Sequence, residues 1–431
     1  MKLLHTADLH LGQILYQYYT RTDEHRHFFD QLTDWCLLHR PDLLLVCGDI
    51  FDVSQPGAQV KAFFNSTFVA LRQKLPEMHI VVTAGNHDSP SRIQADNSLW
   101  QMGGVTVIGQ PPSPELLRQP DGWQKDYIVE TPAGYVAALP FCSAWNTDLA
   151  QSLLDYVAQR NSAGLPVVMM AHQTVAGCDF LGHLDSSESI SPVEVGGVRS
   201  LLPETLGHGY DYLALGHIHR PQTIGRPVDE EFDEESRYDG PVIRYSGSPL
   251  HVSCDEAYPH TVSLVDIARH GGGTTLRRLR VDQRRHFFDI PSRPAPAAKS
   301  FEEVMTAVDE CYRQHGGGYI RLRVDHGASL PVDFINRLYN HLDETTHNEL
   351  RLNPKTIWEN KPTATDDTSR PTFLIAELQQ MTDPLQFVKQ TIDRYDGLDV
   401  DKLDSFFSEI EAELRLMDEE RNNKTKHAPR S

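Results

Sequence analysis

Short runs of apolar residues alternate with helical patterns over the first half of the chain. Residues 2–6, 42–47 and 79–83 are predicted strands, and residues 25–39 and 58–75 carry apolar side chains at helical spacing. Four later apolar runs are also predicted strands: residues 167–171, 212–215, 242–245 and 261–265. Unbroken apolar strands are typical of a sheet that is covered on both faces. The pattern therefore predicts a mixed α/β core.

A different pattern follows a stretch rich in proline and alanine at residues 291–299, which we interpret as a linker. Beyond it we expect a small α+β unit, with helices at 301–313 and 332–342 and strands at 319–324 and 350–352. The end of the chain carries two apolar stripes at helical spacing, which predict a pair of C-terminal helices. The predicted parts are residues 1–275, 280–360 and 375–431.

The composition is that of a globular protein, with 39% hydrophobic and 23% charged residues in a chain of 431. No stretch approaches the roughly 18 apolar residues that a membrane helix needs. The N-terminus reaches His5 and Asp8 too early to hold the apolar core of a secretory signal. Six scattered cysteines without a CxxC pair favour reduced thiols over disulfides or a thiolate zinc site. We therefore expect a cytoplasmic protein.

The net charge is strongly negative, because 60 Asp and Glu outnumber 40 Lys and Arg to give -20. A chain with this charge is not a general binder of polyanions, so any contact with nucleic acid needs a local basic surface, a metal site or a partner. No GxxxxGK[ST] loop occurs, so an ATP-driven step would also need a partner. We interpret the acidic stretch 229–239 as a solvated loop; the alternative is that it repels DNA from one edge of a site.

Each of five predicted strands ends in a cluster of Asp, Asn or His. The clusters are Asp8 with His10, Asp49 with Asp52, Asn86 with His87 and Asp88, His172, and His217 with His219. The carboxyl ends of the strands of an open α/β sheet line one crevice, so these side chains should meet. Residues two apart on an extended chain face the same way, which would point Asp8 and His10 inward together. Glycines before Asp49, Asn86 and His217 allow tight turns.

This set of side chains contains enough ligands for two metal ions. Asp49 could bridge two cations about 3.5–4 Å apart, the spacing of a two-metal hydrolase. Several imidazoles favour Mn²⁺, Fe or Zn²⁺ over Mg²⁺, which prefers oxygen ligands. The alternative is that these residues form ordinary turns with satisfied histidines. A single cluster would suit that alternative, whereas five in order after apolar strands favour a metal site.

The motifs D-x-H, G-D-x-x-D, G-N-H-D, a lone His after a strand and G-H-x-H together resemble those of the calcineurin-like metallophosphoesterases. The longer strings TADLHLG, CGDIFD, AGNHDS, LALGHIHRPQ and YSGSPL are similar, more narrowly, to the SbcD-type nuclease subunits of SbcCD complexes. The motifs cover residues 1 to about 257. The resemblance implies an α/β fold: a β-sandwich flanked by helices, with a small α+β cap domain and a C-terminal helical pair.

The resemblance also implies roles for individual residues. One metal would be held by Asp8, His10, Asp49 and His219, and the other by Asp49, Asn86, His172 and His217. His87 would be the catalytic histidine, which contacts the scissile phosphate and helps to protonate the leaving oxygen. The carboxylate of Asp52 would orient His87 and favour its charged form, although Asp52 could instead be a helix N-cap. The family has an aromatic residue where this chain has Cys254.

The function implied by the resemblance is that of a DNA nuclease subunit. It would be an Mn²⁺-dependent double-strand exonuclease and single-strand and hairpin endonuclease that uses two metals. It would act in DNA repair and recombination with an SbcC-like SMC-type ATPase, bound through residues 375–431, as a homodimer within a heterotetramer. The net charge predicts weak, salt-sensitive DNA binding by the isolated chain. Two alternatives stay open: a partner-independent enzyme for a small phosphodiester, and a metal-binding scaffold with vestigial hydrolysis. The cap could also be regulatory, and the C-terminal helices could pack on this chain itself.

Overall fold

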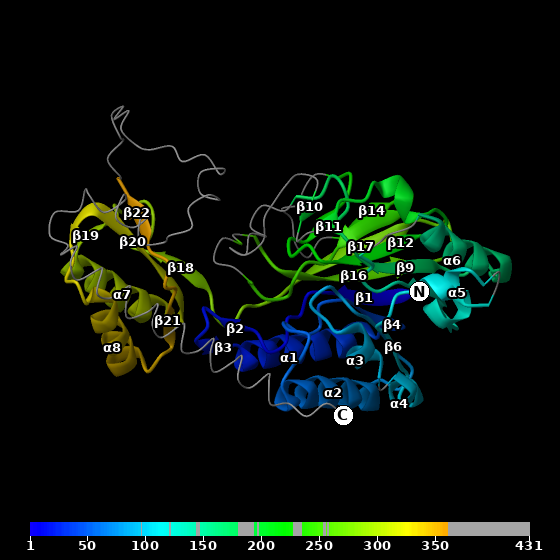
Figure 1. Ribbon diagram of the computed structural model, residues 1–431, viewed down its shortest axis with the longest axis horizontal. Helices are drawn as coiled ribbons and strands as arrows, with labels where there is room; N and C mark the ends of the chain where they lie inside the picture. Colours follow the sequence, from blue (N-terminus) through cyan, green and yellow to red (C-terminus); the bar gives the residue numbers. More distant parts are fainter. Residues whose placement is uncertain are drawn as a thin grey trace, which may run out of the picture. The chain divides into compact units, whose positions relative to one another are not determined.

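Two β-sheets packed against each other form the centre of the first 280 residues in the computed structural model (Figure 1). The structure describes residues 1–95, 97–119, 122–143, 147–179, 194–195, 198–226, 235–252, 256 and 258–360. The first sheet has the order β14-β17-β16-β1-β4-β5-β6 and the second the order β13-β15-β12-β9-β8-β7. The predicted α/β core is thus two facing sheets, as the family resemblance implied, and not one open sheet.

The first sheet is built on parallel strands joined by helices. Its strands are β1 (Lys2–Thr6), β4 (Leu43–Cys47), β5 (His79–Thr83), β6 (Val105–Ile108), β14 (Glu235–Tyr238), β16 (Thr261–Ile267) and β17 (Thr274–Arg280). The strands β1, β4, β5 and β6 run parallel, whereas β16 pairs with β1 antiparallel. Consecutive parallel strands place their carboxyl ends at one edge of the sheet, which is where the predicted ligand clusters begin.

The apolar run of β4 has no polar position because both of its faces are buried. Leu43, Leu45 and Cys47 belong to the core between the two sheets. Leu44 and Val46 face the other way and pack with the helices α1 (Thr22–His39) and α2 (Ala58–Lys74). Because side chains alternate along a strand, both sets must be apolar. Figure 1 shows α1 and α2 on one side of this sheet and the second sheet on the other.

The second sheet carries the remaining strands of the core. They are β7 (Ile128–Thr131), β8 (Gly134–Ala138), β9 (Val167–His172), β12 (Tyr212–Gly216), β13 (Gln222–Thr223) and β15 (Val242–Tyr245). The strands β8, β9, β12 and β15 are parallel, so their carboxyl ends also share one edge. The helix α6 (Thr147–Arg160) packs against β8. The sequence pattern missed β7 and β8, because these segments have only four and five residues and β8 begins with a glycine.

A separate small sheet with two helices follows residue 286. Its strands are β18 (Phe287–Ile290), β19 (Ala298–Ser300), β20 (Gly318–Ser329), β21 (Leu350–Leu352) and β22 (Ile357–Glu359). The helices α7 (Phe301–His315) and α8 (Phe334–Thr346) share one apolar core with this sheet. Its link to α1 is polar: the Tyr319 hydroxyl donates to Glu24 at 2.7 Å, and Glu24 accepts from Arg21. We call residues 287–359 the cap.

Two predictions about connecting segments were wrong. The supposed linker 291–299 lies inside the cap, because β18 precedes it and β19 overlaps its end. The acidic stretch is not a loop throughout, because Glu235–Tyr238 form the edge strand β14 paired with β17. The predicted boundary at residue 275 falls within β17. The C-terminal helices at 375–431 and Cys254 lie outside the described residues. No helix in the described part combines the length and apolar character that crossing a membrane requires.

Candidate metal centre

The predicted ligands come together where the carboxyl ends of strands from both sheets meet. Two groups form, each with its ligand atoms within 4.8 Å of one another. The first group is Asp8, His10 and His219, and the second is Asp49, His172 and His217. The loops after β1, β4 and β5 of the first sheet supply Asp8, His10, Asp49 and Asn86, and the ends of β9 and β12 of the second supply the rest. The centre therefore spans the interface between the sheets.

The first group has the donor atoms that a cation needs. The Nε2 atoms of His10 and His219 lie 3.3 Å apart. Asp8 is only 1% exposed, and its Oδ2 has no hydrogen-bond partner among the described residues. Its Oδ1 accepts from the backbone N–H of His217 at 2.9 Å. A buried carboxylate oxygen without a donor beside two imidazole nitrogens fits a divalent cation, which would satisfy all three atoms.

The second group converges on the side-chain oxygen of Asn86. This Oδ1 lies 3.1 Å from His172 Nε2 and 3.1 Å from His217 Nδ1. The carboxylate of Asp49 reaches the same His172 nitrogen at 3.2 Å. The other carboxylate oxygen of Asp49, Oδ1, accepts a hydrogen bond from the backbone N–H of His87 at 2.9 Å. Two imidazole nitrogens, an amide oxygen and a carboxylate thus face one point, which also fits a divalent cation.

The buried carboxylates of both groups favour the protonated form of neighbouring imidazoles. Burial opposes a charge on His10, but the carboxylates of Asp52, Asp49 and Asp8 prevail and raise its pKa to about 9. Burial likewise opposes a charge on His172, yet Asp49 and Asp8 raise its pKa to about 9. The pKa of Asp49 lies well below its usual range, against its burial, because of the charges of His172 and His10. Since cations bind neutral imidazoles, metal binding should release protons.

Four of the clustered residues have left-handed backbone conformations. The φ angles are 54° for Asp8, 45° for His10, 49° for Asp49 and 96° for His217. Residues other than glycine adopt this region at an energetic cost, and such residues gather at functional sites. Asp8 and His10 therefore face the centre through tight turns of the backbone. The expectation that an extended chain aligns them was wrong, because β1 ends at Thr6.

Three glycines make room for the ligands. A Cβ atom on Gly48 would lie 2.1 Å from His172 Nδ1, and one on Gly85 would lie 2.1 Å from Asp49 Oδ1. A Cβ on Gly216 would lie 1.9 Å from the carbonyl oxygen of Cys47. Of the three, only Gly48 has a positive φ, of 82°. These glycines therefore act mainly by leaving space in which an imidazole, a carboxylate or a backbone carbonyl can approach the chain. Allowing the backbone to turn tightly is a smaller part of their effect.

His87 lies beside the first group, with its ring centroid 4.9 Å from that of His10. Its Nδ1 lies 3.1 Å from the backbone carbonyl oxygen of Asp52. The carboxylate of Asp52 instead lies 3.4 Å from His10 Nδ1. The structure therefore brings Asp52 to both histidines, through different atoms. The carboxylate contact that the resemblance implied for His87 is made with His10.

Comparison with known proteins identifies the chain's family. A family model described as calcineurin-like phosphoesterase matches residues 1–221. The chain belongs to this family. It is similar to proteins named as the SbcD component of the nuclease SbcCD, with 31% identity to that of Rhodobacter capsulatus over 72% of this chain and 75% of the relative. The Bacillus subtilis protein is 31% identical over 78% of this chain and 82% of the relative. The Escherichia coli K12 protein is 28% identical over 61% of this chain and 65% of the relative.

Family membership and the two side-chain groups together indicate a divalent-metal centre in a hydrolase of the phosphoesterase type. The family motif G-N-H-D also contains a residue to which the sequence assigned no role. Asp88 is 4% exposed and accepts three backbone hydrogen bonds, from Gly85 at 2.8 Å, Phe51 at 3.0 Å and Ile50 at 3.1 Å. It ties the loop after β5 to the loop after β4. The motif drew attention to this carboxylate, but only the fold shows what it binds.

A second carboxylate was missed altogether. Glu256, which is 2% exposed, places Oε1 at 3.4 Å from Nδ1 of His219. Nothing in the sequence pattern connects the two residues, because 37 positions separate them and Glu256 lies in no helix or strand.

Proposed function

We propose that this chain is a metal-dependent DNA nuclease subunit of the SbcCD type. It would cut DNA as a double-strand exonuclease and as a single-strand and hairpin endonuclease. The observation that carries the proposal is the pair of ligand groups, Asp8–His10–His219 and Asp49–His172–His217, with His87 beside the first. The names of the relatives support a nuclease activity.

The ligands proposed for the two ions are the predicted ones. Asp8, His10, Asp49 and His219 would hold one ion, and Asp49, Asn86, His172 and His217 the other. Two bound cations would supply an activated water and neutralise charge on the phosphate. Mn²⁺ is the ion we propose, since each set combines hard oxygen ligands with two imidazoles.

His87 is the proposed general acid. A backbone carbonyl can only accept, so the contact with Asp52 places a proton on Nδ1 of His87. That leaves Nε2 as the atom that holds or gives up the catalytic proton. The ring is half-buried, so it can meet a phosphate that binds over the first group. A proton delivered from Nε2 would stabilise the leaving oxygen as the P–O bond breaks.

The partner we propose is an SbcC-like ATPase, bound through the C-terminal helices predicted at 375–431, and the compartment is the cytoplasm. The net charge of -20 supports a need for this partner, because the chain alone lacks the basic excess of a DNA-binding protein. We further propose a homodimer within a heterotetramer. Its support is a mostly apolar hollow between α2 and α4 (Asn97–Met102), which is lined by Val69 and Leu99, side chains that are 47% and 69% exposed.

The test is cleavage of a hairpin-ended duplex with added Mn²⁺ by the wild type and by His87→Asn, with and without the ATPase and ATP. We expect cleavage that needs Mn²⁺, falls about 10²–10⁴-fold in His87→Asn and rises with the partner and ATP. Metal analysis should still find two ions in His87→Asn. The matched control is His208→Asn, since that histidine is exposed. Brisk hydrolysis of a small aryl phosphodiester without DNA cleavage would contradict the proposal.

A further inference from the structure

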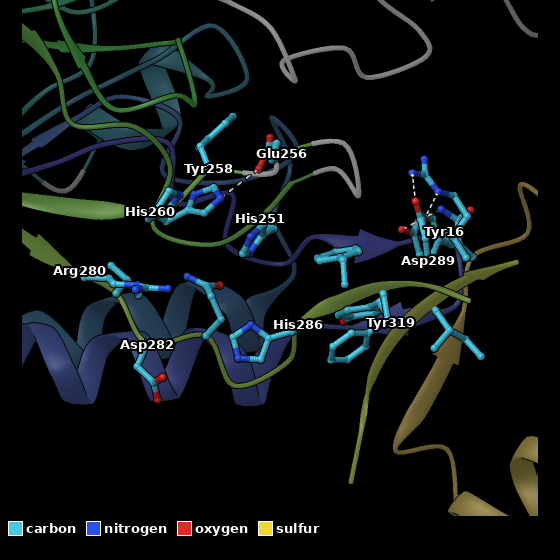
Figure 2. A pocket seen from close by; sticks show the side chains of 18 residues that line it. Tyr16, His251, Glu256, Tyr258, His260, Arg280, Asp282, His286, Asp289 and Tyr319 are labelled. Carbon is cyan, nitrogen blue, oxygen red and sulfur yellow. Dashed lines mark hydrogen bonds and ion pairs between the residues drawn. The ribbon is translucent and has the colours of Figure 1, made fainter. Parts of the chain in front are cut away.

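Glu256 is buried, and both of its carboxylate oxygens have close neighbours. Its Oε2 accepts from the backbone N–H of Val252 at 2.9 Å and lies 3.4 Å from His260 Nε2. Its Oε1 faces His219 Nδ1 at 3.4 Å. Figure 2 shows Glu256 beside His260 in the wall of a cavity of about 680 Å³. The carboxylate is therefore buried, with one oxygen bound by the backbone of Val252 and the other facing His219.

This contact determines which nitrogen of His219 can bind a metal. A carboxylate oxygen accepts a hydrogen bond, so it favours the tautomer with the proton on Nδ1 of His219. The lone pair is then on Nε2, the atom that faces His10 Nε2 at 3.3 Å. A carboxylate behind a ligating imidazole fixes its orientation and makes it a stronger ligand.

The second group has a different support. His172 places Nδ1 at 2.8 Å from the backbone carbonyl of Cys47, which carries no net charge. In the first group, Asp52 lies behind His10 and Glu256 behind His219. His10 and His219 thus each face a carboxylate at 3.4 Å, whereas the nearest oxygen to His172 Nδ1 is a backbone carbonyl and the carboxylate of Asp8 lies farther away, at 3.9 Å.

We propose that Glu256 is a positioning residue that sets the metal affinity of the Asp8–His10–His219 group and not that of the Asp49–His172–His217 group. The inference rests on the proposed metal centre. It adds a residue outside both sets of predicted ligands, which acts only through His219. Replacement by glutamine keeps the volume. If the amide oxygen keeps the hydrogen bond from Val252, the amide NH₂ faces His219 Nδ1 and favours the proton on Nε2, where the lone pair is needed.

The experiment measures Mn²⁺ binding by the full chain, using calorimetry and the electron paramagnetic resonance of free Mn²⁺. Glu256→Gln is made in the wild type and in two variants that each disable one group, His217→Ala and His10→Ala. In His217→Ala, where the first group remains, we expect Glu256→Gln to weaken binding about 10–100-fold. In His10→Ala, where the second group remains, we expect no change. Asp282→Asn is the control, since Asp282 lines the same cavity with its side chain 78% exposed.

If Glu256→Gln leaves the Mn²⁺ affinity of His217→Ala unchanged, the proposal is overturned. It is also overturned if Glu256→Gln weakens Mn²⁺ binding equally in both backgrounds and lowers the melting temperature. Should Glu256→Gln fail to fold, Glu256→Asp keeps the charge and withdraws the oxygens, and the same selective loss is expected. With DNA, the Mn²⁺ concentration for half-maximal cleavage should rise in Glu256→Gln, while kcat at saturating Mn²⁺ stays near that of the wild type. The binding measurement needs no cleavage, so a chain that binds two ions but does not cut DNA refutes the nuclease proposal alone.

Discussion

The imidazole of His87 donates a hydrogen bond to the backbone carbonyl of Asp52 and does not contact the carboxylate of that residue. Nδ1 of His87 lies 3.1 Å from the carbonyl oxygen of Asp52, while the carboxylate of the same residue lies 3.4 Å from His10 Nδ1. One residue thus supports two histidines of different proposed roles. Because the support of His87 is main chain, a substitution at position 52 should leave that histidine in place.

The first prediction follows directly for Asp52→Asn. The variant should keep the orientation of His87 but weaken the support of His10, so the Mn²⁺ concentration for half-maximal cleavage should rise about tenfold. Cleavage at saturating Mn²⁺ should stay within a few-fold of the wild type. The measurement is a Mn²⁺ titration of the cleavage rate. A rate that collapses although both ions are bound would show that the carboxylate acts on His87 itself.

The second prediction concerns the number of ions. His217→Ala removes one of the two imidazoles that face Asn86 Oδ1, so the second group loses a ligand while the first keeps its own. Purified protein should bind one Mn²⁺ in place of two, and cleavage should be lost together with that ion. Metal analysis after dialysis measures the ratio of ions to protein. Two tightly bound ions in the variant would remove His217 from the ligand set.

The third prediction concerns Asp88, which holds two loops through three backbone N–H groups. In Asp88→Asn the amide oxygen can replace only one carboxylate oxygen, so at least one buried N–H faces an NH₂ group. The free energy of unfolding should fall by about 1–3 kcal/mol. Urea unfolding with chelator present measures it, and Asp126→Asn is the control because Asp126 is exposed. A loss no greater than that of the control would refute the role.

The fourth prediction is a pH dependence of stability that originates in β1. His5 is fully buried with Nδ1 at 2.9 Å from the Tyr212 hydroxyl, and burial together with the charge of Arg244 lowers its pKa to about 3. In the unfolded chain its pKa is about 6.5. Between these values the unfolded state binds a proton that the folded state does not, so stability falls with falling pH by about 1.4 kcal/mol per pH unit.

His5→Gln removes this titration. Between pH 7.5 and 5.5, the loss of unfolding free energy should be about 1.4 kcal/mol smaller in His5→Gln than in the wild type, because one pH unit of that interval lies below 6.5. Urea unfolding at both pH values measures the difference. The exposed His208→Gln should keep the wild-type dependence. Identical pH dependence in His5→Gln and the wild type would mean that His5 becomes protonated without unfolding.

The sequence was a good guide where one physical requirement determines the residues. The strand β4 was predicted because burial on both faces demands an unbroken apolar run, and the ligand clusters were found because they follow such strands. In contrast, β17 reads Thr-Thr-Leu-Arg-Arg-Leu-Arg and was missed, because its arginines hide the alternation of a strand even though Arg278 is buried. The β8 strand, Gly-Tyr-Val-Ala-Ala, was missed for its glycine and small side chains.

Within the centre, the motifs indicated which residues gather but not which atoms meet. The resemblance paired the Asp52 carboxylate with His87, whereas in the structure that carboxylate faces His10 and the backbone carbonyl of Asp52 faces His87. Glu256 lies far from His219 in the chain and meets it only through tertiary folding. The left-handed turns at Asp8 and His10 also have no sequence signature beyond the residue types themselves, since Asp and His tolerate that region better than most residues.

The left-handed conformations of Asp8, His10, Asp49 and His217 cost folding free energy, although the proposed metal centre needs these four side chains. Glycine would relax each of these positions, and every such exchange would delete a proposed ligand. Selection for folding alone, in the absence of metal or substrate, would therefore erode the centre one ligand at a time. A campaign to make this protein more heat-resistant should accordingly screen for catalysis at every round, because the substitutions that inactivate it at these four positions are among those that a stability screen would reward.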